Sequence, residues 1–372
     1  MSQSEPTTSI AITGSNGFIG SNLKYWIVDK YKKVNLYEVN RETSERKLTE
    51  IIKNVDVIVH CAGTNRSDDE SDFIEGNVTY IEKIITHCIT ASVAPRIILL
   101  SSIHSGRKDV YGTTKASCED IVNEYRADYC QSSTILKLPG IFGKWSRPNY
   151  NSVVATFCNN VAKGMELSID DHSKEIDLLY IDDLVNTICN LIFNVEEKEE
   201  YKKNIFRVRI KWLANYISEL HVARKMLSVP SFSNSLEKNL YSTYLSFLEK
   251  SQFEYNIASN HDVRGWFMEL FKSKHSGQVS ALSLNPGITR GGHHHHTKVE
   301  KFIVLSGTVI FNLYNIKTLE KVSIESIDKV SRIVEIPPGW SHTITNNGNE
   351  VALLVVWANE IYDGQRPDTH LS

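Results

Sequence analysis

The sequence predicts two domains of different class: an N-terminal α/β domain with a doubly wound parallel sheet of the Rossmann type, and a C-terminal all-β domain built as a jelly-roll barrel. Apolar, strand-like runs alternate with amphipathic stretches through about residue 190, which is typical of βαβ units. A glycine-rich turn follows the first of these strands. After about Ser276, short β-rich runs separated by Gly, Pro and Asn turns replace the helical pattern.

The strands expected in the first domain are residues 9–13, 34–39, 55–61, 96–101 and 134–137. The third is continuous in apolar residues, as a parallel strand buried on both faces should be. Residues 205–275 are predicted to be helical, because Leu and Phe recur at spacings of three and four. The strands expected in the second domain are residues 279–284, 302–304, 308–314, 332–336 and 351–357.

These patterns predict a nucleotide-binding domain over residues 1–255, a linker over 256–276 and a metal-binding β-domain over 277–372. The 372 residues are enough for two domains of ordinary size.

Composition excludes several classes of protein. The net charge of −3 disfavours nucleic acid as the main partner. The longest apolar stretch, residues 351–358, is far shorter than the ~20 residues of a membrane span. Residues 1–9 lack the pattern of a secretory signal, and the six cysteines have no CxxC spacing. We therefore expect a cytoplasmic protein with reduced cysteines and no membrane partner.

The first strand runs into a GxxGxxG turn and then a helix, which predicts a dinucleotide site. The glycines allow backbone N–H groups to approach a pyrophosphate at the positive end of the helix. The residues expected to bind the cofactor here are Gly14, Asn16, Gly17, Phe18, Ile19 and Gly20.

The end of the second strand bears on which nicotinamide nucleotide binds. Arg41 can hold a 2′-phosphate, which favours NADP(H), whereas Glu38 can accept from the ribose hydroxyls of NAD. We take NADP(H) as the expected cofactor and keep NAD as the alternative.

Tyr111 and Lys115 are spaced i and i+4, so they share one face of a helix. A neighbouring ammonium lowers the pKa of a phenol, and such a tyrosine can exchange a proton with a carbonyl oxygen during hydride transfer. Ser102, with Ser101 as the fallback, ends the preceding strand and can bind the same oxygen.

These motifs resemble the extended short-chain dehydrogenase/reductase family. The matching segments are Thr13–Gly20, His60–Gly63, Asn77-Val78, Ser101-Ser102, Tyr111 with Lys115, and Tyr180–Asp183. The resemblance implies a nucleotide-sugar substrate, Tyr111 as proton donor, Lys115 as the cation that tunes it, Ser102 as hydrogen-bond donor to the carbonyl, and Ala62 and Gly63 at the cofactor. The chain departs from the family in the short gap between Ser102 and Tyr111, and it lacks the acid pair of 4,6-dehydratases.

The segment 143–152 reads as a polar loop that contacts substrate. Arg147 is the expected phosphate ligand, and Asn149 and Asn151 are expected to bind sugar hydroxyls.

His293, His295, Glu300 and His342 have the spacing of a divalent metal site. Histidines two apart on a strand point the same way, so His294 and His296 with Glu300 are an alternative set. The two segments around these residues resemble the two motifs of the cupin family. Zinc is the expected metal, with iron, nickel or manganese as alternatives.

The whole chain resembles the bifunctional epimerase/reductases of the UDP-N-acetyl-L-fucosamine pathway, through segments 143–152, 262–269, 276–281 and 286–302. The resemblance implies C3 epimerisation of a UDP-4-keto-6-deoxy-hexosamine in the cupin domain. NADPH-dependent reduction at C4 would follow, giving UDP-2-acetamido-2,6-dideoxy-L-talose for capsule or O-antigen synthesis. It also implies a homodimer.

The epimerase base stays open among His294, His296, Lys298 and Tyr314. Two other readings also stay open for the cupin domain: a non-catalytic sensor or ligand-binding module beside an NADP-dependent 4-reductase, and an iron-dependent oxygenase.

Overall fold

The computed structural model describes residues 7–130, 132–150, 152–193, 200–327, 330 and 332–371. The chain divides into two compact units, one formed by residues 1–218 and 234–248 and the other by 219–233 and 249–372. Within the described ranges, no helix is both long and apolar enough to cross a membrane.

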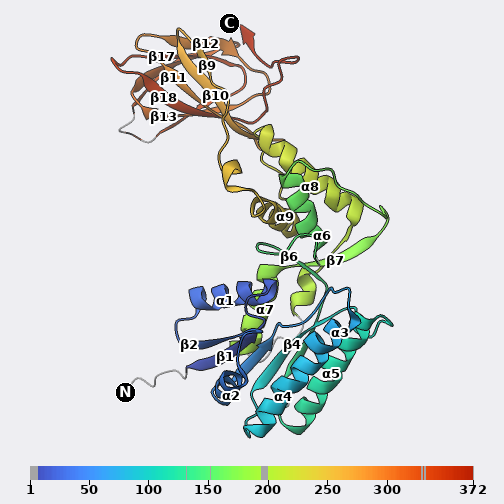
Figure 1. The fold of residues 1–372 in the computed structure, drawn as a ribbon. Helices are drawn as coiled ribbons and strands as arrows, with labels where there is room; N and C mark the ends of the chain where they lie inside the picture. Colours follow the sequence, from blue (N-terminus) through green and yellow to red (C-terminus); the bar gives the residue numbers. More distant parts are fainter. Residues whose placement is uncertain are drawn as a thin grey trace, which may run out of the picture. The chain divides into compact units, whose positions relative to one another are not determined.

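The first unit is built on a five-stranded parallel sheet with the order β2-β1-β3-β4-β5 (Figure 1). Its strands are β1 (Thr8–Thr13), β2 (Val34–Val39), β3 (Val57–His60), β4 (Arg96–Ser102) and β5 (Thr134–Leu138). All five lie where the sequence predicts strands, and they differ from the expected bounds only at their ends. The central strands β1, β3 and β4 are buried on both faces, so helices must cover both sides of the sheet.

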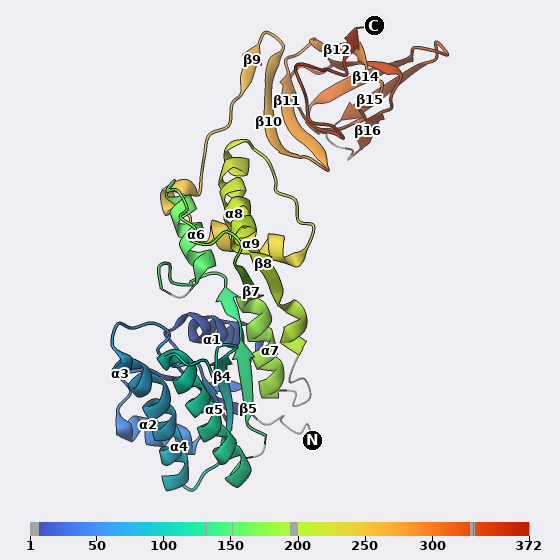
Figure 2. The same ribbon diagram turned by 90° about the vertical axis from the view of Figure 1, so that its right-hand side faces the viewer.

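Helices cover both faces of this sheet (Figure 2). On one face, α1 (Phe18–Lys30) and α7 (Ile181–Phe193) pack on a core that includes Ile10, Val59 and Leu100. On the other, α2 (Glu45–Lys53), α4 (Tyr80–Thr90) and α5 (Val110–Asp128) pack around Ala11, Ile58 and Leu99. Alternate residues of each strand therefore serve opposite cores, and the prediction of a Rossmann-type doubly wound sheet is confirmed.

A smaller three-stranded sheet adjoins this core, with the order β6-β7-β8. Its strands are β6 (Gly140–Phe142), β7 (Glu175–Tyr180) and β8 (Phe206–Arg209). Near it, α6 (Val153–Ala162) packs against α9 (Ser235–Leu245). Two short helices precede α4, namely α3 (Glu70–Phe73) and the π-helix η1 (Ile74–Thr79), and two 3₁₀ turns cover Glu200–Asn204 and Lys250–Gln252.

The helical prediction for residues 205–275 is correct only for α8 (Ile210–Lys225) and α9. The segment 256–276, expected to be a linker, contains β9 (Asn260–Asp262) and β10 (Gly265–Ser273). β10 pairs along its length with β11 (Gly277–Leu284), with a register shift between Glu269 and Phe271. That shift interrupts the strict alternation by which a strand is recognised in sequence.

The main part of the second unit is two antiparallel sheets. A six-stranded sheet has the order β16-β13-β18-β11-β10-β9, and a five-stranded sheet has the order β15-β14-β17-β12-β19. The strands not yet given are β12 (Thr289–His294), β13 (Glu300–Ser306), β14 (Thr308–Asn315), β15 (Lys321–Ile327), β16 (Ile333–Ile336), β17 (Trp340–Asn346), β18 (Ala352–Ala358) and β19 (His370–Leu371). Inward-facing residues of both sheets, among them Leu284, Phe302 and Phe311, share one buried core, and the predicted all-β class is confirmed.

Candidate active site and metal centre

The turn after β1 is as tight as the glycine spacing predicts. Gly14 has a φ of +64°, and its N–H donates to the Val39 carbonyl at 2.9 Å. A Cβ on Gly20 would lie 2.2 Å from the Gly14 carbonyl oxygen, so only glycine fits there. Gly17 caps α1 without any capping side chain among the described residues. The N–H groups of the first turn, which includes Phe18 and Ile19, therefore remain available to an anion.

The chain after β3 closes against this turn. A Cβ on Gly14 would lie 2.9 Å from Ala62 N, so these two backbones touch. A Cβ on Gly63 would lie 2.7 Å from Asn77 Oδ1 and 3.2 Å from Lys115 Nζ. The structure thus brings Ala62 and Gly63 to the glycine turn on one side and to the lysine on the other. This narrow cradle fits the backbone approach that a dinucleotide requires.

Glu38 and Arg41 differ in whether another side chain pairs with their charge. The Glu38 carboxylate forms an ion pair with Lys24 at 3.0 Å. Arg41 is exposed, and it has no hydrogen bond or ion pair with any described residue. Arg41 is therefore the free charge at the end of β2, while Glu38 is already neutralised by its partner.

Tyr111 and Ser102 come together at the start of α5. The Asp109 side chain caps this helix by accepting from Gly112 N at 2.7 Å, which fixes the first turn that carries Tyr111. Burial raises the pKa of Tyr111, and the hydrogen bond with Ser102 opposes that shift without reversing it. The structure therefore differs from the expectation that Lys115 lowers this pKa: the phenol is held protonated.

Lys115 is almost fully buried, and its ammonium lies beside the Tyr111 ring. Its Nζ lies 3.5 Å from the Leu100 carbonyl oxygen and 5.9 Å from the centre of the Tyr111 ring. Burial lowers the pKa of Lys115, while Cys118, Glu119 and Cys61 act against that shift. A buried ammonium of this kind has spare donor capacity for a ligand hydroxyl.

Ser101, the alternative to Ser102, is committed elsewhere. Its hydroxyl donates to Glu119 Oε1 at 2.5 Å, and the other carboxylate oxygen of Glu119 pairs with Lys137 at 2.9 Å. Adjacent residues of a strand point to opposite faces, so only one of the two serines can meet Tyr111.

Asn77 has no role predicted from its sequence context, yet it is buried in the centre of this group. Its Oδ1 accepts from Thr64 N at 3.0 Å, and its Nδ2 donates to the Thr64 carbonyl at 3.1 Å and to Thr114 Oγ1 at 3.3 Å. It lies in the π-helix η1, a helix type often found at functional sites. The one signal available from the sequence was its place in the segment Asn77-Val78.

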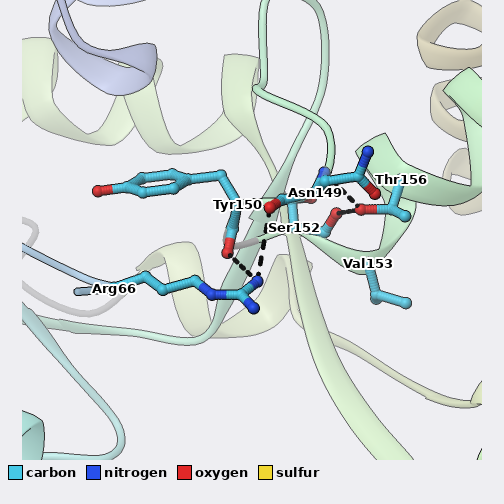
Figure 3. A pocket seen from close by; sticks show the side chains of 6 residues that line it. All are labelled: Arg66, Asn149, Tyr150, Ser152, Val153 and Thr156. Atoms are coloured by element: carbon cyan, nitrogen blue, oxygen red, sulfur yellow. Dashed lines mark hydrogen bonds between the residues drawn. The ribbon is translucent and has the colours of Figure 1, made fainter. Parts of the chain in front are cut away.

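A pocket of about 400 Å³ lies beside the loop at 143–152 (Figure 3). It is lined by Arg66, Asn149, Tyr150, Ser152, Val153 and Thr156. Arg66 Nη1 donates to the Asn149 and Tyr150 carbonyls at 3.4 and 3.3 Å, so the guanidinium reaches across to the loop. Asn149 itself has a φ of +56°, and Thr156 Oγ1 accepts from its N–H at 2.9 Å.

The other loop residues named from the sequence do not line this pocket. The Arg147 guanidinium is exposed and lies 5.3 Å from the centre of the Tyr150 ring. Asn151 lies outside the described residues. Arg66 was missed because it is a single cation in a loop with no motif around it.

His293, His295, Glu300 and His342 gather in the second unit, with one candidate ligand atom from each within 4.8 Å of the others. Glu300 Oε2 lies 3.4 Å from His295 Nε2 and 3.3 Å from His342 Nε2. His293 and His342 are cross-strand partners on β12 and β17. Three strands and one turn thus converge on a single point.

The chemistry of this group fits a divalent metal. His295 Nε2 and Glu300 Oε2 are buried without a hydrogen-bond partner among the described residues, which is costly unless a ligand satisfies them. His295 Nδ1 donates to the Asp368 carbonyl, which directs Nε2 toward the centre. Burial lowers the pKa of His293, and it lowers that of His342 to about 4, so both imidazoles are neutral and able to bind a cation.

A β-bulge selects this set over the alternative one. Gly291 pairs with Thr343 and His293 with His342, so one extra residue, Gly292, stands in β12. The extra residue reverses which side chains face inward from His293 onward. His294 and His296 therefore lie on the opposite face, where their rings come within 5.4 and 4.6 Å of the His370 ring.

The fold and both sites define a two-domain, nucleotide-binding protein with a cupin-like second domain. Residues 10–206 match the NAD dependent epimerase/dehydratase family, and residues 260–370 match the polysaccharide biosynthesis C-terminal domain. The chain belongs to the NAD dependent epimerase/dehydratase family, whose cofactor is a nicotinamide dinucleotide.

Two relatives match over nearly their whole length. The UDP-2-acetamido-2,6-beta-L-arabino-hexul-4-ose reductase of Pseudomonas aeruginosa PA103 is 36% identical over 97% of both chains. The crystal structure of the capsular polysaccharide assembling protein CapF from Staphylococcus aureus, 36% identical, aligns with a TM-score of 0.90 over 97% of this chain and 99% of that one.

The UDP-glucose 4-epimerase of Thermotoga maritima aligns with 64% of this chain and 98% of its own at a TM-score of 0.53 and 17% identity. That likeness shows the fold alone.

Proposed function

We propose that this chain carries out two consecutive reactions on one UDP-4-keto-6-deoxy-hexosamine. The second unit epimerises C3, and the first unit then reduces the C4 ketone with NADPH to give UDP-2-acetamido-2,6-dideoxy-L-talose. The observation that carries the reductase half is the meeting of Tyr111, Ser102 and Lys115 beside the glycine turn. The Pseudomonas relative, named as a reductase of a hexul-4-ose, supports a ketone at C4. The product would serve UDP-N-acetyl-L-fucosamine and hence capsule or O-antigen synthesis.

In the reductase site, the chain's own residues handle the oxygen and the proton. NADPH, when bound, supplies the hydride for C4. Tyr111 has a raised pKa, so its phenol holds a proton that it donates to O4 as the ketone becomes an alcohol. The Ser102 hydroxyl orients the same oxygen through a hydrogen bond. The Lys115 ammonium donates to the nicotinamide ribose and stabilises the phenolate that the proton transfer leaves behind.

The pyrophosphate of the cofactor is held by the glycine turn and the first turn of α1, namely Gly14, Asn16, Gly17, Phe18, Ile19 and Gly20. The backbones of Ala62 and Gly63 approach the dinucleotide. Arg41 pairs with the 2′-phosphate, which makes NADPH the preferred nucleotide. Arg66 and Asn149 bind the UDP-sugar in their pocket. Arg147 and Asn151 remain proposed substrate ligands on the same loop.

In the second unit, His293, His295, Glu300 and His342 hold a divalent metal, with zinc as the first choice. Such a metal, when bound, would supply a Lewis acid that could stabilise the enolate formed when C3 loses its acidic proton. Among the four candidate bases, Lys298 is the one whose charge acts on His293, Glu300 and His342. Since an ammonium cannot accept a proton, we take Lys298 as the cation that stabilises the enolate left when C3 loses its proton, and the base itself is left open. His294 and His296 lie on the far face of β12 and are set aside.

The alternative function is that of an NADP-dependent 4-reductase whose cupin unit binds a ligand without catalysis. The two functions differ in one observable, the exchange of the C3 proton with solvent. We also expect the enzyme to work in the cytoplasm as a homodimer, an expectation drawn from its resemblance to the bifunctional enzymes.

The test incubates the full chain with NADPH and the UDP-4-keto-6-deoxy-hexosamine in deuterated water, with the product read by NMR. Tyr111→Phe and His342→Ala run in parallel. Tyr111→Phe should exchange the C3 proton without oxidising NADPH. His342→Ala should lose C3 exchange yet reduce the C3-epimerised ketone when that sugar is supplied.

Oxidation of NADPH without any C3 exchange would leave a reductase with a non-catalytic cupin unit. If neither signal appears, the proposed substrate is wrong. Metal analysis of the purified protein, before and after chelation, measures the cation separately from activity.

A further inference from the structure

The outer face of β12 carries a second group of imidazoles that plays no part in the proposed reactions. His294 lies directly opposite His370 in the pairing of β12 with β19. His296, two residues beyond the end of β12, lies on the same side, with its ring beside those of His294 and His370. The three histidines come from two segments more than 70 residues apart, and the fold brings them together.

The three rings form a compact triangle. Their centres are separated by 5.3 Å between His294 and His296, 5.4 Å between His294 and His370, and 4.6 Å between His296 and His370. Asp368 stands beside them, with Oδ1 3.3 Å from His370 Nε2. Its carboxylate also accepts from the backbone N–H groups of His296, Thr297 and Lys298, which fastens the C-terminal segment to the histidine run.

We propose that His294, His296 and His370 form a second divalent-metal site, separate from the buried one, for an ion that imidazoles suit, such as zinc, nickel or copper. In the described residues only the buried set already has its ligand atoms within 4.8 Å, so the outer nitrogens must converge by side-chain rotation. His296 and His370 are exposed, and exposed side chains change rotamer without disturbing a core. Water completes the coordination on the open side, and Asp368 orients His370 through its ring nitrogen.

The second site gives the C-terminal segment a mechanical role. β19 contains only two residues, a length that contributes little pairing energy alone. A metal shared by β12 and His370 would hold β19 in place, and with it Asp368, whose carbonyl orients His295 toward the buried centre. The outer ion would thus stabilise the inner ligand set without touching it.

The test titrates Zn²⁺ into full-length protein stripped with a chelator, by calorimetry, and checks stoichiometry by elemental analysis. His370→Ala should bind one equivalent of Zn²⁺ fewer than the wild type, or should bind the same number with the affinity for one of them lowered about tenfold or more. Losing even a residue that only hydrogen-bonds a metal ligand lowers metal affinity by this order. His296→Ala should behave like His370→Ala. His261→Ala, which removes an exposed histidine on β9, is the matched control and should bind like the wild type.

His370→Ala is the decisive variant because it leaves all four consecutive histidines intact. If the run alone captured zinc, as a histidine tag does, His370→Ala would bind as the wild type does and the proposal would be overturned. Identical binding by His296→Ala and the wild type would overturn it as well. The test compares each variant with the wild type, so its result does not depend on whether the buried set binds its own ion or whether the proposed reactions occur.

Discussion

The hydroxyl of Ser101 donates a hydrogen bond of 2.5 Å to the buried carboxylate of Glu119, whereas its neighbour Ser102 hydrogen-bonds to Tyr111. Two adjacent serines at the end of one strand thus form hydrogen bonds with different partners on opposite faces of the sheet. Ser101 satisfies a carboxylate inside the first unit, and Ser102 faces the proposed reaction site.

Substituting each serine by alanine separates these duties. Ser102→Ala should lower kcat for NADPH oxidation by about 10²–10³, the usual loss when one donor to a reacting oxygen is removed. Ser101→Ala should leave kcat within a few-fold but destabilise the first unit by roughly 1–3 kcal/mol, because Glu119 loses a buried partner. Steady-state kinetics and thermal unfolding of both variants measure the contrast. Equal loss of kcat in the two would contradict the assignment.

Arg41 is expected to decide between the two nicotinamide nucleotides. Arg41→Ala should raise KM for NADPH by about tenfold or more, because a charge-assisted hydrogen bond to the 2′-phosphate contributes roughly 1.5–3 kcal/mol. KM for NADH should barely change. Arg46→Ala, at an exposed position on α2, is the control and should leave both values unaltered. An equal rise for the two nucleotides would show that Arg41 does not read the phosphate.

Arg66 is expected to bind the UDP-sugar through the pocket beside the loop at 143–152. Arg66→Ala should raise KM for the sugar nucleotide about tenfold, with a smaller effect on kcat, since it removes a cation and two contacts to the Asn149 and Tyr150 carbonyls. Arg126→Ala, which removes an exposed charge on α5, should leave KM as it is. An unchanged KM in Arg66→Ala would mean that the substrate lies elsewhere.

His60 should make the first unit sensitive to acid. Burial, with the nearby Lys115 charge, lowers the pKa of His60 to about 3, against an ordinary value of 6.5. The unfolded chain therefore takes up a proton below pH 6.5 that the folded chain refuses. The stability that His60 contributes is complete above pH 6.5 and is lost as the pH falls toward 3, by about 1.4 kcal/mol per pH unit.

His60→Asn removes the titratable imidazole and leaves an amide that can hydrogen-bond Thr13 Oγ1. Hydrogen exchange of β1 and β3 amides between pH 7 and 4 reports on this unit alone. The wild type should lose protection more steeply than the variant. Parallel loss in both proteins would assign the acid sensitivity to other groups.

Local patterns predicted most of the fold because they follow directly from burial. β2 has the expected bounds, Val34–Val39. The parallel sheet follows from the central strands β1, β3 and β4, which are apolar on both faces. β10 escaped prediction because its register shift breaks the alternation between Glu269 and Phe271.

At the candidate sites, residue type and spacing identified the groups but not their surroundings. Tyr111 and Lys115 were found from their spacing, yet burial raises the pKa of the phenol, and sequence carries no measure of burial. Arg66 and Asn77 were missed because tertiary contacts alone bring them to the pocket and to Gly63. These are long-range consequences of folding that no local pattern contains.

The bulge at Gly291 and Gly292 decides which two of the four consecutive histidines face the buried centre. Gly291, at a φ of +100°, approaches the His342 carbonyl so closely that a Cβ would lie 2.4 Å from that oxygen. If β12 kept Gly292 but paired regularly with β17, His294 and His296 would turn inward and His293 and His295 outward, yet each face would still receive two imidazoles. A run of four identical residues thus keeps two imidazoles on each face after a one-residue slip in strand register, which would destroy an ordinary alternating ligand pair.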